Sequence, residues 1–174
     1  MKRLLTAALA ALSIAMPVQA RIDPNTDELL NAMQSDGIQV AINSSRCKRN
    51  DIHGSFTFRP GSSWRLLTLC PGLTVDDLDH STVRHEAIHA IQWCANNLRG
   101  ASYNTPLLND YKRFQQEVFA ELYVSEIERI HTYYDEADYY VEYEAHLYER
   151  TKTSAEILHL YNAVCGPMRP YIMS

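Results

Sequence analysis

The first half of the chain carries short segments in which apolar and polar residues alternate. Residues 38–42, 55–59 and 64–70 follow this pattern, with aliphatic and aromatic side chains at the apolar positions. A two-residue period places one side of a strand against a core and the other side toward solvent. The Pro-Gly-Ser-Ser sequence at 60–63 separates the second strand from the third, so we expect these two strands to form a hairpin.

Elsewhere, apolar residues recur every three or four positions, which predicts helices. The predicted helices are 21–35, about 75–98, 110–131, about 136–150, and one that begins at Thr153, where Glu156 completes a capping box, and ends before Gly166. This order predicts an α+β fold, with a small antiparallel sheet in the N-terminal half packed on the helix at 75–98 and a helical C-terminal half. Residues 21–174 contain no repeat or linker and are expected to form one domain.

The first 20 residues have the features of a secretory signal peptide. Met1-Lys2-Arg3 is basic, an apolar run extends to Val18, and the sequence at 18–20 fits a cleavage site. The apolar run is short for a membrane span, which needs about 20 residues, and no second run follows it. We therefore expect cleavage after Ala20 and a periplasmic or secreted mature protein without a membrane anchor.

Four cysteines follow this leader, and an even number in an exported protein favours two disulfides. Three connectivities are possible. We favour Cys47–Cys70, which would join two neighbouring strands, and Cys94–Cys165, which would tie the helix at 75–98 to the end of the chain. Zinc binding by cysteines is the weaker alternative, because the chain has no C-x-x-C pair.

The most specific motif is the H-E-x-x-H sequence from His85 to His89. It lies inside the helix predicted at 75–98, and residues four apart on a helix share one face. Two imidazoles at this spacing can bind one Zn²⁺ ion. Glu86 lies beside them and can reach a water without being a ligand, which suits a general base. The motif therefore predicts His85 and His89 as zinc ligands and Glu86 as the catalytic base.

Three segments, LLTLC, STVRHEAIHAIQWC and EYEAH, together resemble small zincin-like proteins of bacteria and phages that have gluzincin features. The shared features are a strand that ends in cysteine, an R-H-E-x-x-H helix with a cysteine just after it, and a later E-x-E-A segment. The resemblance extends over roughly residues 46–165. It implies a zinc-dependent peptidase whose substrates are peptides or proteins.

A catalytic zinc normally has three protein ligands and one open position, so a third ligand is expected after the motif. The metzincin pattern is excluded, because Gln92 and Ala95 stand where that pattern has glycine and histidine. A glutamate on a later helix remains. Glu144 is the first choice, because it matches the E-x-E-A segment of the resembling proteins. Glu117 and Glu142 are the alternatives.

The resemblance to gluzincins implies that Glu86 accepts a proton from a zinc-activated water that attacks a peptide carbonyl. A second group that stabilises the oxyanion is expected. Tyr139, Tyr140 and Tyr143 are candidates, although tyrosines at these spacings also pack in cores. The main interpretation is a zinc-dependent peptidase, and the alternative is a non-enzymatic extracytoplasmic module that uses a zincin-like fold for binding or structure. The formal net charge of −5 does not favour nucleic acid or an anionic membrane as a partner.

Overall fold

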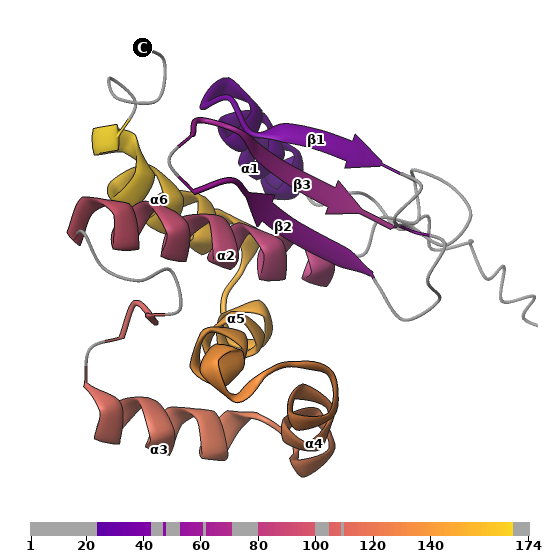
Figure 1. Cartoon of the computed structure of the whole chain (residues 1–174), viewed down its shortest axis with the longest axis vertical. Helices are drawn as coiled ribbons and strands as arrows, with labels where there is room; N and C mark the ends of the chain where they lie inside the picture. Colours follow the sequence, from indigo (N-terminus) through magenta and orange to yellow (C-terminus); the bar gives the residue numbers. More distant parts are fainter. Residues whose placement is uncertain are drawn as a thin grey trace, which may run out of the picture.

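The computed structural model describes residues 24–42, 47, 53–60, 62–70, 80–99, 105–108 and 110–168. Within these residues the chain has an α+β fold, with a three-stranded sheet in the N-terminal half and helices mostly in the C-terminal half (Figure 1). The predicted signal peptide and the first residues of the helix predicted at about 75–98 lie outside the described residues. No helix in the described ranges is long and apolar enough to cross a membrane.

The strands β1 (Gln39–Ile42), β2 (Gly54–Phe58) and β3 (Arg65–Leu69) form the sheet in the order β1-β3-β2. The predicted hairpin is confirmed, because β2 and β3 are antiparallel. The prediction of an all-antiparallel sheet is wrong for β1, which runs parallel to β3. Alternation specifies the faces of a strand and not its direction, which explains the error. The most apolar strand, β3, takes the central position, and β2 is left at an edge.

Three helices pack around one side of this sheet: α1 (Pro24–Ser35), α2 (His80–Arg99) and α6 (Ser154–Cys165). Their apolar side chains form the main core together with those of β3. The fully buried members of this core include Leu29, Met33, Leu67, Leu69, Val83, Ala87, Ile88, Ile91, Ile157 and Tyr161. The turn between α1 and β1 depends on Gly37, whose φ of 80° is a conformation that side-chain-bearing residues rarely adopt. α1 ends at Ser35, which is the end predicted for the helix at 21–35.

A second apolar cluster lies on the opposite side of α2 from the sheet (Figure 1). It is formed by α3 (Tyr111–Glu121), α4 (Val124–Tyr133) and α5 (Tyr139–Thr151), the last preceded by a short 3₁₀ turn, η3 (Glu136–Asp138). The single helix predicted at 110–131 is wrong, because the chain is extended at Leu122 (ψ 139°) and a new helix begins at Val124. Leu122 is buried in the same cluster, so the spacing of apolar residues continues across the break. The break between α3 and α4 therefore cannot be recognised from that spacing.

Both predicted disulfides are confirmed. Cys47 bonds to Cys70 and Cys94 to Cys165, each with a Cα–Cα distance of 5.3 Å. The first joins the segments that follow the neighbouring strands β1 and β3, and the second ties α2 to the end of α6. Two disulfides fit a protein that resides in an oxidising, extracytoplasmic compartment. The predicted capping box of the last helix is also present, with Thr153 and Glu156 bonded to each other's backbone.

Candidate metal centre

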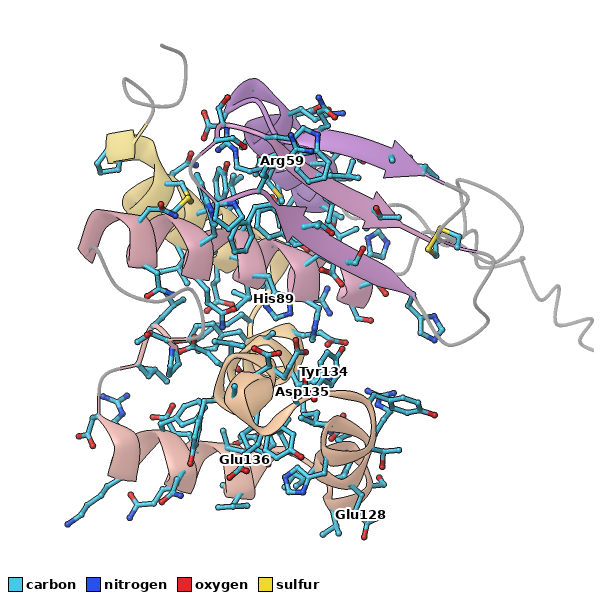
Figure 2. All side chains as sticks on the ribbon, in the orientation of Figure 1. Arg59, His89, Glu128, Tyr134, Asp135 and Glu136 are labelled. Atoms are coloured by element: carbon cyan, nitrogen blue, oxygen red, sulfur yellow. A yellow bond between two sulfur atoms is a disulfide. The ribbon has the colours of Figure 1, made fainter. Side chains whose placement is uncertain are left out.

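The two faces of α2 have different neighbours. Val83, Ala87 and Ile91, spaced four residues apart, belong to the main core. His85 and His89 are offset from this row by two residues, which on a helix is more than half a turn. The two histidines therefore lie away from the core, and in Figure 2 His89 lies between α2 and α5. Because one side of α2 is buried in the main core, the side that carries both imidazoles lies at the boundary between the two apolar clusters.

Three side-chain groups converge at this boundary, two from α2 and one from α5. The Nε2 atoms of His85 and His89 lie 3.1 Å apart. The carboxylate of Glu142 completes the group, with Oε2 3.5 Å from Nε2 of His85 and Oε1 3.4 Å from Nε2 of His89. His85, His89 and Glu142 could together hold a metal ion. His85 and Glu142 are almost fully buried, with 7 % and 6 % exposure.

The separations between these donor atoms are short enough for the three groups to share one metal ion. Zinc bonds to nitrogen and oxygen at about 2.0–2.1 Å, which places tetrahedral ligand atoms about 3.3 Å apart. An octahedral ion with bonds of the same length would bring adjacent ligands to about 2.9 Å, and calcium prefers six or more oxygens. The observed separations of 3.1, 3.4 and 3.5 Å allow the three groups to bind one such ion. Two imidazoles and one carboxylate are also ligand types that zinc accepts.

The outer nitrogen of each imidazole has its own acceptor. Nδ1 of His85 lies 3.1 Å from Oε2 of Glu149, and Nδ1 of His89 lies 2.8 Å from Oε1 of Gln92. When the imidazoles are neutral, these contacts favour the ring proton on Nδ1, which directs the Nε2 lone pair into the group. Lone pairs of two imidazoles and a carboxylate repel one another unless a proton or a cation lies between them. The contacts of Glu149 and Gln92 with the two Nδ1 atoms therefore favour a cation between the two Nε2 atoms and the Glu142 carboxylate.

Glu144, the first choice from the sequence, does not lie in this group. Its buried carboxylate accepts hydrogen bonds from the backbone N–H groups of Leu107 and Leu108, at 2.7 and 2.8 Å. It also accepts one from Nε2 of Gln92 at 2.9 Å. Glu144 therefore fixes the orientation of the amide that accepts the proton of His89. Glu142 replaces Glu144 as the candidate third ligand, because residues two apart on α5 point to different sides of the helix.

Glu117, the other alternative from the sequence, and the nearby His146 lie outside the group formed by His85, His89 and Glu142. Glu117 forms an ion pair with Arg113 on α3, with an N–O distance of 2.7 Å, and lies outside the group. His146 lies beside the centre, where Nδ1 is 3.3 Å from Oε2 of Glu149. His85, His146 and Glu149 form a second group capable of holding a metal, but it shares His85 with the first. The same glutamate accepts a hydrogen bond from Nε of Arg84 at its backbone carbonyl, which fixes its position.

The ionisable groups of the centre shift one another's pKa. Burial lowers the pKa of His85, but hydrogen bonds with Glu142 and Glu149 outweigh burial and raise it to about 10. Burial raises the pKa of Glu142, but the charge of His89 and hydrogen bonds with both histidines hold that pKa well below its usual range. The pKa of His89 is raised by Glu142 despite its burial. The carboxylate therefore stays ionised and attracts positive charge into the centre.

Glu86 lies next to the centre without belonging to the group. It is buried, and its carboxylate accepts a hydrogen bond from the backbone N–H of Phe56 on β2. Burial raises the pKa of Glu86, while the charges of His85 and His89 lower it in part. Oε2 of Glu86 is buried without a hydrogen-bond partner, and the buried Oε2 of Glu142 has only the long 3.5 Å contact with Nε2 of His85 described above. Two such oxygens at one centre are typical of a site that binds an ion and a water.

The tyrosines expected near the site have other contacts. The Tyr143 hydroxyl hydrogen-bonds to His131, Tyr139 stacks on the same imidazole, and Tyr140 packs against Phe114. Tyr134, just after α4, instead hydrogen-bonds to the Glu142 carboxylate, and although the residue is 40 % exposed, its partial burial together with the charges of Glu142 and Glu86 raises its pKa. The sequence indicated Tyr139, Tyr140 and Tyr143 but not this residue, because Tyr134 lies between helices, where no period identifies the side it faces.

A hollow of about 180 Å³ opens beside the centre. Its walls combine apolar and aromatic side chains with two residues of the metal group. The lining residues are Phe56, Phe58, His89, Gln92, Trp93, Asp138, Val141 and Glu142. A larger apolar hollow of about 450 Å³ lies between Leu107, Leu160 and Val164 and contains none of the histidines or carboxylates described above. The smaller hollow is therefore the one that opens beside His89 and Glu142.

No family model, curated protein or solved structure matches the chain. The function of this site is therefore inferred from its geometry and chemistry.

Proposed function

We propose that the protein is a zinc-dependent peptidase that acts outside the cytoplasm. The observation that carries this proposal is the convergence of Nε2 of His85, Nε2 of His89 and the Glu142 carboxylate, with buried Glu86 beside them. A purely structural zinc needs a fourth protein ligand. Among the described residues the group offers three ligands, which is the number that a catalytic zinc uses.

The side chains around the centre have separate roles in this proposal. When bound to His85, His89 and Glu142, zinc would supply a Lewis acid and lower the pKa of a water. Glu86 accepts the proton of the attacking water and passes it to the leaving amine, a role that its raised pKa favours. The Tyr134 hydroxyl donates a hydrogen bond to the carbonyl oxygen as negative charge develops there.

Two features favour a peptide as the substrate. β2 lies at the edge of the sheet, and an edge strand can pair with an extended peptide. The hollow beside His89 and Glu142 is lined in part by Phe56, Phe58 and Trp93, and it can hold one side chain of that peptide. We further propose that residues 1–20 are a signal peptide, which agrees with the two disulfides of the folded domain.

The test of this function is hydrolysis of a mixture of fluorogenic peptides by the zinc-loaded, oxidised protein. Glu86→Gln should retain zinc and lower turnover by about 10²–10⁴-fold, the range for removal of a general base. Glu117→Gln, on α3 and outside the centre, is the matched control and should keep full turnover. A Glu86→Gln protein as active as the wild type would exclude Glu86 from the reaction. A wild-type protein that binds zinc and cleaves no peptide would favour a binding module.

A further inference from the structure

The edge strand β2 contacts α2 at the position of Glu86. The backbone N–H of Phe56 donates a hydrogen bond to the Glu86 carboxylate. Two residues earlier on the same strand is Gly54, which pairs with Leu69 of β3. Residues two apart on a strand face the same side, so Gly54 and Phe56 both lie against the part of α2 that carries Glu86.

Gly54 has no room for a side chain. A Cβ atom at this position would lie 2.7 Å from Cγ2 of Thr82, 2.8 Å from Oε1 of Glu86 and 2.9 Å from Cγ of Glu86. All three distances are shorter than side-chain atoms tolerate, and two of them involve Glu86. Thr82 lies one helical turn before Glu86, so both residues share the face of α2 that β2 covers.

The other described glycines differ from Gly54. Gly37 has a positive φ of 80°, so its backbone conformation requires glycine. A Cβ at Gly166 would meet nothing within 4 Å. Gly54 has neither a positive φ nor free space. Since glycine within a strand is destabilising, a strand glycine without a conformational need indicates a close approach by a neighbour.

The three candidate ligands do not depend on this approach. His85 and His89 are on α2 and Glu142 is on α5, so their mutual distances are set by the packing of these two helices. Glu86 is instead held between α2 and β2. It is 5 % exposed and cannot swing into solvent to make room. Metal binding and the position of Glu86 are therefore controlled by different contacts.

We infer that Gly54 is a positioning residue for Glu86: the absence of a side chain at this point of β2 lets the Glu86 carboxylate sit against the strand and accept the Phe56 N–H. This inference rests on the proposed function for its catalytic meaning, and its structural part stands without it. A side chain at Gly54 displaces Glu86 while the two histidines and Glu142 keep their arrangement.

The test is hydrogen exchange of the Phe56 amide in Gly54→Ala, with Gly166→Ala as the matched control. We expect exchange at Phe56 to be about tenfold faster or more in Gly54→Ala, the effect of losing one hydrogen bond to a carboxylate. Exchange at Leu67, in the central strand, should be unchanged, and zinc should remain near one ion per chain. Unchanged exchange at Phe56 in Gly54→Ala would overturn the inference. This readout needs no substrate, so it is independent of peptidase activity.

A double-mutant cycle keeps the inference testable if Gly54→Ala folds poorly. The cycle combines Gly54→Ala with Glu86→Ala in a Thr82→Ser background, which removes the methyl group nearest to Gly54 in every variant. We expect Gly54→Ala to lower the melting temperature strongly when Glu86 is present and little when it is alanine. Equal losses in the two cases would show that Glu86 does not cause the requirement for glycine and would overturn the inference.

Discussion

Replacing three glutamates one at a time tests which of them binds zinc, because each should change the zinc affinity by a different amount. Glu142 is a candidate ligand, with oxygens 3.4 and 3.5 Å from the two Nε2 atoms. Glu144 acts through Gln92 on His89, along contacts of 2.9 and 2.8 Å. Glu117 is bound to Arg113 on α3. The account therefore predicts a large loss of zinc affinity for Glu142→Ala, a moderate loss for Glu144→Gln and none for Glu117→Gln.

The magnitudes follow from the role of each carboxylate. Four-ligand structural zinc sites bind with about 10–16 kcal/mol, so one ligand contributes roughly 2.5–4 kcal/mol by equal division, and its loss should weaken binding about 10²–10³-fold. Removal of a group that orients a ligand typically costs about 10–100-fold in affinity. Glu144→Gln retains an oxygen for Leu107 or Leu108 but presents an amide N–H to the other, so we expect its effect near the upper end of this range.

The assay is competition for zinc against a fluorescent chelator at pH 7.5, with melting curves of each metal-free variant to show that it is folded. Equal affinity of Glu142→Ala and the wild type would refute the assignment of Glu142 as the third ligand. A larger loss for Glu144→Gln than for Glu142→Ala, in proteins that melt at similar temperatures, would restore Glu144 as the ligand and refute the network through Gln92.

Three further predictions concern the surroundings of the centre. Tyr134→Phe should keep zinc and lower turnover about 10²-fold or more, the scale for loss of an oxyanion donor, whereas Tyr139→Phe should match the wild type in the same peptide assay. The folded-state pKa of His85 is raised from 6.5 to about 10. Its charge therefore stabilises the metal-free protein fully below pH 6.5, and this stabilisation is lost as the pH rises toward 10. Since zinc requires the neutral imidazole, the increase in melting temperature caused by zinc should grow from pH 6.5 to pH 9, and an increase that shrinks over this range would contradict the assigned ligand. Replacing Cys94 and Cys165 by alanine opens a link across 71 residues and should lower the free energy of unfolding by about 4 kcal/mol, measured in urea; a loss below about 1 kcal/mol would contradict a tie that constrains the unfolded chain.

The locally encoded features of this protein were predicted from its sequence. The hairpin of β2 and β3 depends on a short turn, and the spacing of His85 and His89 depends on one helical turn. Both disulfides were predicted because a single pairing joins neighbouring strands and ties the motif helix to the end of the chain. These features require knowledge of one or two elements at a time.

Features that depend on how helices and strands pack against one another were not predicted. Glu142 and Glu144 lie two residues apart on α5, so the choice between them depends on which side of α5 faces α2. That side is set by tertiary packing and by the N–H groups of Leu107 and Leu108, which bind the Glu144 carboxylate. The direction of β1 is similarly a property of the assembled sheet. The contact of Tyr134 with Glu142 depends on the path of the chain between α4 and η3.

The most direct test of the metal centre is the zinc-to-protein ratio of the oxidised protein, measured by elemental mass spectrometry after purification without chelators. The account predicts a ratio near one for the wild type and a ratio well below one for Glu142→Ala. A wild-type ratio near zero that added zinc does not raise would contradict the central claim that His85, His89 and Glu142 together bind one zinc ion.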